Sequence, residues 1–184
     1  MSSRSHVGVT LIELMVTISL IVILLALAVP SLQSLVRKAE LRSAAREFAA
    51  ALVYARSEAI KRGLPVTMCK SGNPEAVLPG CSTDASWQGG WLVFVDRDED
   101  AVADYSAVPP DQALRVGGPY AASLTVLPDD AYATFEDFVR YLPGGLSSGK
   151  DGQASGSLCI KLLEQSRLLE IGSTGHVAVE DSPC

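Results

Sequence analysis

A run of uncharged, mostly apolar residues at positions 14–29 constrains the fold of this chain more than any other feature. As a helix the run would be about 24 Å long, slightly short of the apolar core of a bilayer unless residues 9–12 extend it. Glu13 stands directly before the run, and burying an unpaired carboxylate in apolar surroundings is costly. We therefore expect a membrane helix in which another group compensates the charge of Glu13.

The segment before this run is short and polar. Residues 1–8 include Arg4, His6 and three serines, so we expect a leader that is removed rather than a folded element. Basic residues do not orient the span clearly, because Arg4 precedes it while Arg37, Lys38 and Arg42 follow it.

An ordinary secretory signal is the alternative interpretation of the same region. Ala26-Leu27-Ala28 would be a plausible cleavage site after an apolar core, and cleavage there would release a soluble protein. Glu13 argues against this alternative, because an ordinary signal has no reason to carry a carboxylate at that position.

A helical pattern continues beyond the apolar run to Arg62. Apolar residues recur there at alternating steps of four and three, which places them on one helix face: Leu41, Ala45, Phe48, Leu52, Ala55 and Ala59. Lys61 and Arg62, followed by Gly63, are typical of a helix C-terminus. Pro30 would kink this helix, unless Ser31 caps a new one.

After Gly63 the sequence becomes typical of β-structure. Residues 64–69 and 90–95 are rich in β-branched and aromatic residues, and we predict that they form paired strands. Further strands are predicted at residues 113–116, 123–127, 133–141, 158–163, 167–172 and 176–179. Residues 70–88 and 143–157 are expected to be loops. The chain is thus expected to be α+β, with a mainly antiparallel head.

Charge differs sharply between the two parts of the chain. Residues 9–62 carry seven basic and four acidic residues, a net charge of +3, whereas residues 63–184 carry seven basic and seventeen acidic residues, a net charge of −10. A head of this charge repels phosphate backbones overall, although a local basic patch could still bind them.

Four cysteines, Cys69, Cys81, Cys159 and Cys184, all follow the apolar run. An even number in one small domain indicates disulfides and an oxidising compartment. Metal binding is less favoured, because no Cys-x-x-Cys pair or nearby histidine is present. Of the three possible connectivities we favour the local pair Cys69 with Cys81, together with Cys159 and Cys184, which would fasten the tail.

The residues around the start of the apolar run carry a resemblance to a known class of signal. Gly8-Val9-Thr10-Leu11-Ile12-Glu13-Leu14, after a short polar leader, resembles the class III signal of type IV pilins and pseudopilins. The resemblance implies that a prepilin peptidase cuts after Gly8 and methylates Val9. It also implies that Glu13 pairs with the amino terminus of a neighbouring subunit, and that the leader stays in the cytoplasm while the head is periplasmic.

A second resemblance narrows the family. Three stretches are similar to the FimT/FimU/GspH group of minor pilins and pseudopilins. They are Tyr54-Ala55-Arg56-Ser57-Glu58-Ala59-Ile60-Lys61-Arg62-Gly63, then Val66-Thr67-Met68-Cys69, and then Trp87 with Gly90-Trp91-Leu92-Val93-Phe94-Val95-Asp96. Together with the amino terminus they span roughly the first half of the chain.

This resemblance implies a pilin fold and a division of the chain into four parts. These are a leader (1–8), a transmembrane or filament-core helix (9–30), an amphipathic helix on the head (31–62) and a β-rich periplasmic head (63–184). The implied function is non-enzymatic: the protein is drawn from the inner membrane into a tip or priming complex with other minor pilins and a major pilin. The alternatives are a DNA-binding minor pilin for DNA uptake and a GspH-like pseudopilin of type II secretion.

The DNA-binding alternative has its own sequence test. Some FimT-like proteins carry a Gly-Arg-x-Arg motif near the carboxyl terminus, but the corresponding stretch here, Gly175-His176-Val177-Ala178, has neither arginine. DNA binding would then require four basic residues to converge on one face: Arg115, Arg140, Lys161 and Arg167.

Three further motifs are weak. The acidic residues 96–100 resemble the start of a calcium loop, but Ala101 and Ala107 replace the required glycine and glutamate, so we favour a solvated acidic turn. Residues 144–150 match the spacing of a phosphate-binding loop, but Asp151 replaces the Ser/Thr and no helix is predicted to follow. His176 alone cannot form a catalytic triad. No catalytic residue, metal ligand or cofactor is expected.

Overall fold

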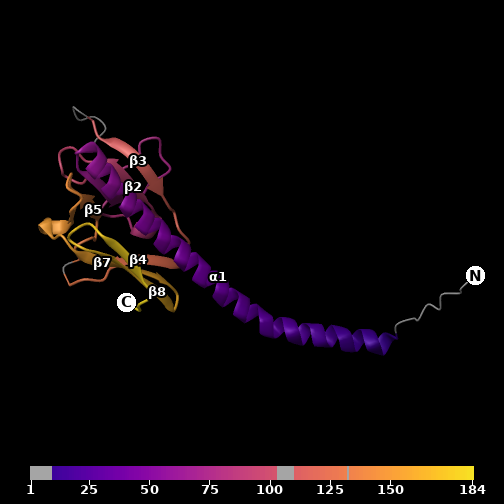
Figure 1. Ribbon diagram of the computed structural model, residues 1–184. Helices are drawn as coiled ribbons and strands as arrows, with labels where there is room; N and C mark the ends of the chain where they lie inside the picture. Colours follow the sequence, from indigo (N-terminus) through magenta and orange to yellow (C-terminus); the bar gives the residue numbers. More distant parts are fainter. Residues whose placement is uncertain (1–9, 103–109, 132) are drawn as a thin grey trace, which may run out of the picture. The chain divides into compact units, whose positions relative to one another are not determined.

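The computed structural model describes residues 10–102, 110–131 and 133–184, without the side chains of residues 27–31 (Figure 1). The chain divides into two compact units, Met1–Ala39 and Glu40–Cys184. Gly8 and Val9, the expected processing residues, lie outside the described part of the chain.

The long helix α1 (Leu11–Arg62) is helical in all of its 52 residues, so neither a break at Pro30 nor a new cap at Ser31 interrupts it. It ends as its sequence predicts: Lys61 and Arg62 lie in the last turn, and Gly63 follows with a φ of +65°. Judged by hydropathy, the described residues contain no helix that is long and apolar enough to cross a membrane.

Within the second unit, hereafter the head, one face of α1 enters the hydrophobic core. All six residues of the predicted apolar face are buried, and Ala44 and Ala51 join them. Phe48 is central, with its ring 6.1 Å from that of Trp87, 6.4 Å from that of Trp91 and 5.3 Å from that of Tyr120. The predicted packing face is thus confirmed, and it holds this part of α1 against the β-structure.

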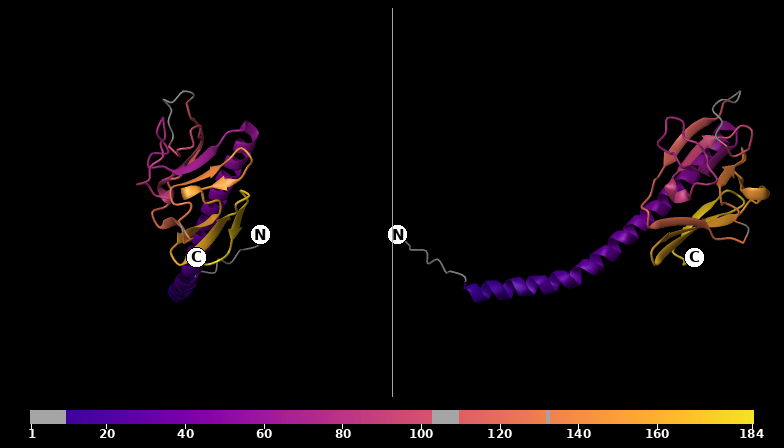
Figure 2. Two further views of the ribbon diagram at one scale, coloured as in Figure 1. Left: turned by 90° about the vertical axis from the view of Figure 1, so that its left-hand side faces the viewer. Right: turned by 180° about the vertical axis from the view of Figure 1, so that it is seen from behind.

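Two antiparallel sheets form the rest of the head. The first has the order β3-β2-β1-β5-β6, and the second has the order β4-β7-β8-β9. The strands of the first sheet are β1 (Val66–Lys70), β2 (Trp91–Val95), β3 (Gln112–Gly117), β5 (Phe138–Tyr141) and β6 (Ser147–Ser148). Those of the second are β4 (Leu124–Pro128), β7 (Gly156–Leu162), β8 (Gln165–Ile171) and β9 (Val177–Glu180). Short 3₁₀ turns lie at Trp87–Gly89 and Lys150–Gly152. Residues of both sheets share one core with α1, and Figure 2 shows the sheets along this part of the helix.

The first sheet buries side chains on both faces. Met68 and Val93 belong to the core shared with α1, whereas Cys69, Leu92 and Phe94 form a second, smaller cluster. Because successive side chains of a strand point to opposite faces, this double burial explains why every residue of β1 and β2 is buried. The pairing of the two strands, predicted from sequence, is confirmed, with Met68 opposite Val93.

Two predictions about the β-structure were wrong. The strand predicted at residues 133–141 begins only at Phe138, because the carbonyl of Phe135 accepts a hydrogen bond from Trp87 Nε1 at 3.1 Å instead of joining the ladder. The loop predicted at residues 143–157 contains β6, whose Ser147 pairs with Tyr141. Ser147 is buried, and its one hydroxyl donor lies within hydrogen-bond distance of the carbonyls of both Ala154 and Gly172, a tertiary contact that sequence pattern does not reveal.

Both disulfides form within the head. Cys69 is joined to Cys81 and Cys159 to Cys184, the connectivity favoured from the sequence, and no described cysteine remains free. The first links β1 to the loop that precedes Trp87. The second ties the last residue of the chain to β7.

Candidate functional site

Thr10 and Glu13 begin helix α1. The side-chain oxygen of Thr10 accepts a hydrogen bond from the backbone N–H of Glu13 at 3.3 Å, as an N-cap does. The spacing Thr10-Leu11-Ile12-Glu13 is that of a capping box, and it places the carboxylate in the first turn, where the helix dipole favours negative charge. Glu13 is exposed, and no other described residue forms an ion pair with it. Its charge is therefore not compensated within the described part of the chain.

The helix that follows Glu13 is apolar on all sides. From Leu11 to Leu25 every large apolar side chain is more than half exposed, and residues 20–25 are six such positions in a row. Six consecutive residues cover the full circumference of a helix, so no polar face remains for water. Among the described residues of its own unit, this surface has no partner. A surface of this kind is stable only against lipid or other apolar helices.

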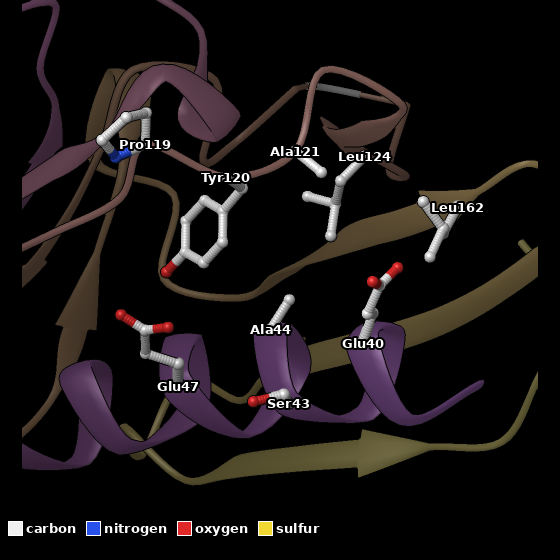
Figure 3. Close-up of a pocket in the computed structure, with 9 residues that line it drawn as sticks. All are labelled: Glu40, Ser43, Ala44, Glu47, Pro119, Tyr120, Ala121, Leu124 and Leu162. Atoms are coloured by element: carbon white, nitrogen blue, oxygen red, sulfur yellow. The ribbon is translucent and has the colours of Figure 1, made fainter. Parts of the chain in front are cut away.

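The head offers a cavity of about 300 Å³ between α1 and the residues that follow β3 (Figure 3). Its apolar lining includes Ala44 on α1 and, facing the helix, Leu124 and Leu162, and Glu40 and Glu47 on α1 also line it. Sequence patterns give no signal for this site, because its lining comes from three separate stretches of the chain, residues 40–47, 119–124 and 162.

Tyr120 is the central polar residue of this cavity. Its hydroxyl accepts a hydrogen bond from Trp91 Nε1 at 2.8 Å, and its ring stacks on Phe48. Burial, the largest effect, raises the pKa of Tyr120 well above 10, the bond from Trp91 opposes the rise, and Glu47 adds to it. The phenol of Tyr120 is therefore neutral. The cavity thus combines an apolar lining with the carboxyl groups of Glu40 and Glu47, a chemistry suited to a basic side chain.

The four basic residues considered for DNA binding do not share one face of the head. Arg140 is buried and pairs with Asp96 at 2.9 Å, while Arg115 lies about 6.0 Å from the ring centres of Tyr54 and Trp91, on the other face of the first sheet. In the second sheet Arg167 is opposite Ile160, so the next residue, Lys161, points to the opposite face.

Arg167 does have basic neighbours on α1. Burial lowers its pKa most, and the positive charges of Arg42 and Arg46 lower it further, while Asp181 forms an ion pair with it. This small cluster is a different grouping from the one considered in the sequence analysis.

Gly175, the first residue of the stretch compared with the DNA-binding motif, has a packing role. Its φ is +77°, and a Cβ atom there would lie 2.0 Å from the carbonyl oxygen of Gly145. Arg56 donates hydrogen bonds to the carbonyls of Gly145 and Thr174 at 3.0 and 2.8 Å, which holds this corner together. The glycine is therefore required by the close approach of two backbones.

The segment that matches a phosphate-binding loop has the wrong local structure. The N–H of Gly149 donates to the carbonyl of Gln153, and that of Lys150 donates to the carbonyl of Thr134. Lys150 Nζ binds Glu136 at 3.1 Å, and only a three-residue 3₁₀ turn follows. Because these amides and this ammonium are already engaged, the segment offers no cradle for phosphate.

The acidic segment at residues 96–100 is only partly the solvated turn expected. Asp98, Glu99 and Asp100 are exposed, but Asp96 is fully buried and hydrogen-bonded to Thr67 and Arg140. Asp111, which the sequence analysis did not consider, lies against the same turn and accepts a hydrogen bond from the N–H of Arg97 at 3.0 Å.

A long N-terminal helix, apolar at its start and packed on antiparallel sheets in the head, is the architecture of the pilin fold, so the protein is a minor pilin or pseudopilin. More specifically, the chain belongs to the GspH family: the family model described as type II transport protein GspH matches residues 44–175.

Solved structures agree with the fold. The chain is similar to two crystal structures of the Pseudomonas aeruginosa type IV minor pilin FimU. The first has 22% identity and a TM-score of 0.55, over 78% of this chain and 90% of FimU. The second has 20% identity and a TM-score of 0.52, over 76% and 91%. The comparison with curated proteins finds no match.

Proposed function

We propose that this protein is a minor subunit that helps to initiate assembly of a type IV pilus, as part of a tip or priming complex. Its role is structural. A prepilin peptidase cuts after Gly8 and methylates Val9, residues 9–30 lie in the inner membrane before assembly and in the filament core afterwards, and the head is periplasmic. The uncharged run at residues 14–29 supports the membrane location.

The observation that carries this proposal is the apolar surface of α1 between Leu11 and Leu25. An isolated helix of this composition is unstable in water, so it requires other helices or lipid around it. A bundle of such helices from neighbouring subunits would bury this surface. The disulfides support the periplasmic location, since they persist in an oxidising compartment.

Glu13 gives this packing its register. A subunit docked with Glu13 against the amino terminus of its neighbour satisfies two charges at once, whereas a shifted subunit leaves both unpaired in apolar surroundings. The exposed position of Glu13 in the first turn of α1 is compatible with such a partner.

The test is a Glu13→Ala variant in the native host. We expect normal membrane insertion and cleavage after Gly8, but much less variant protein in filaments sheared from the cell surface. Glu75→Ala, which removes an exposed carboxylate from a loop of the head, is the matched control and should assemble normally. Incorporation of Glu13→Ala at the wild-type level would refute the role of Glu13.

Two alternatives concern the machine and the ligand. A pseudopilin of type II secretion would use the same helix packing, and deletion of the gene would then abolish secretion rather than piliation. A DNA-binding minor pilin is supported only by the cluster of Arg42, Arg46 and Arg167. A gel shift at low salt that shows micromolar binding, lost on replacement of Arg42 and Arg46, would favour it.

A further inference from the structure

Three carboxylates meet at the loop end of the antiparallel pair formed by β2 and β3. Val95 at the end of β2 is paired with Gln112 at the start of β3, so the next residues outward, Asp96 and Asp111, come to lie opposite one another. Asp98 follows two residues after Asp96. One carboxylate oxygen from each of the three aspartates lies within 4.8 Å of the other two.

Asp96 has an oxygen that no described residue satisfies. Its Oδ2 accepts three hydrogen bonds, at 2.5 Å from Thr67 Oγ1, 3.0 Å from Arg140 Nε and 2.9 Å from Arg140 Nη2. Its Oδ1 has no hydrogen-bond partner among the described residues. Water cannot satisfy it from the surface, because Asp96 is 0% exposed. Leaving a charged oxygen buried without a partner is unfavourable. Oδ1 is therefore the oxygen of Asp96 that can take a ligand.

The charge of the surroundings favours a cation as that ligand. Asp96, Asp98 and Asp111 bring three negative charges together, and Arg140 forms an ion pair with Asp96. Arg140 compensates only the Oδ2 side of Asp96, and Arg97 directs its Nε to the carbonyl of Pro110 at 3.0 Å. Three carboxylates and one guanidinium group leave a net charge of −2, which a divalent cation would offset.

We propose that Asp96, Asp98 and Asp111 form a calcium-binding site. Oxygens bound to Ca²⁺ at 2.3–2.6 Å are up to about 5 Å apart across the ion, so three oxygens within 4.8 Å of one another are compatible with calcium coordination. Mg²⁺, with bonds of about 2.1 Å, requires a tighter set of oxygens. The arrangement is not an EF-hand loop, because Asp111 comes from the far side of the hairpin. Backbone carbonyls and water would complete the six to eight ligands that calcium takes.

The test is isothermal titration of CaCl₂ into the full chain purified in detergent and freed of metal with a chelator. We expect one saturable site per chain with a Kd of about 0.1–1 mM, the range of extracellular calcium modules. The key variant is Asp98→Asn, because Asp98 is exposed and its replacement leaves the pair of Asp96 and Arg140 intact. Asp98→Asn should weaken calcium binding at least about tenfold.

Glu99→Gln is the matched control. It removes one negative charge from the same exposed turn, but Glu99 does not belong to the group of three carboxylates. It should change the Kd less than about twofold, and MgCl₂ should bind the wild-type chain at least about tenfold more weakly than CaCl₂. The proposal is overturned if no saturable binding occurs up to about 10 mM CaCl₂, or if Glu99→Gln weakens binding as much as Asp98→Asn.

Discussion

Replacing Phe48 by alanine should weaken the packing of helix α1 on the core of the head and lower the unfolding free energy. Phe48 is 0% exposed, and its ring contacts Trp87, Trp91 and Tyr120, so the change removes an aromatic group from the centre of the core. Truncations of this kind cost about 3–5 kcal/mol of unfolding free energy. The higher helix propensity of alanine recovers at most about 0.7 kcal/mol.

These values translate into a large thermal effect. For a domain of this size, 1 kcal/mol shifts the unfolding midpoint by about 2–4 °C, so Phe48→Ala should lower Tm by roughly 6–20 °C. Tryptophan fluorescence reports this transition directly, because Trp87 and Trp91 are both buried against Phe48. The scan is made on the full chain in detergent without reductant, so that the disulfides persist.

Val53→Ala is the control for this prediction. Val53 lies on the opposite side of the same helix and is 55% exposed, so its truncation should change the unfolding free energy by less than about 0.5 kcal/mol. If Phe48→Ala lowers Tm no more than Val53→Ala does, α1 is not held by this core and the reasoning fails.

Two further predictions concern charged groups of the head. In a urea titration, Arg140→Met should cost about 3–5 kcal/mol of unfolding free energy, because it leaves the carboxylate of Asp96 buried without its ion pair. Lys150→Met, at an exposed pair, should cost far less. The hydrogen bond from Arg62 is the largest influence on the pKa of Glu58, and it lowers this pKa below the ordinary 4.5. The charged carboxylate therefore stabilises the fold above pH 4.5, and this stabilisation is lost as the pH falls through the lowered pKa. The stability difference between wild type and Glu58→Gln should therefore be present at neutral pH and vanish in acid; a difference that persists unchanged in acid would contradict this assignment.

Local patterns in the sequence were sufficient for most of the elements. The step of four and three from Leu41 to Ala59 determines a helix face whatever it packs on, because the period of a helix is set by its backbone. Strands rich in β-branched and aromatic residues, such as β1 and β2, were likewise predicted to within about two residues. The processing residues Gly8 and Val9 and the role of Glu13 rest on sequence resemblance and remain predictions.

Contacts between distant segments decided the rest. The strand predicted to begin at residue 133 starts late because Trp87 Nε1 donates a hydrogen bond to the carbonyl of Phe135. Ser147 is held in the first sheet by its hydroxyl, which lies within hydrogen-bond distance of the carbonyls of Ala154 and Gly172. The sequence predicts Asp96 to be part of a solvated turn, but its carboxylate is buried and accepts a hydrogen bond from Arg140, 44 residues away. Asp111 joins Asp96 only through the register of β2 and β3. Periodicity in the sequence indicates which face of a strand a side chain occupies, but the residue that the side chain contacts depends on how the strands pair.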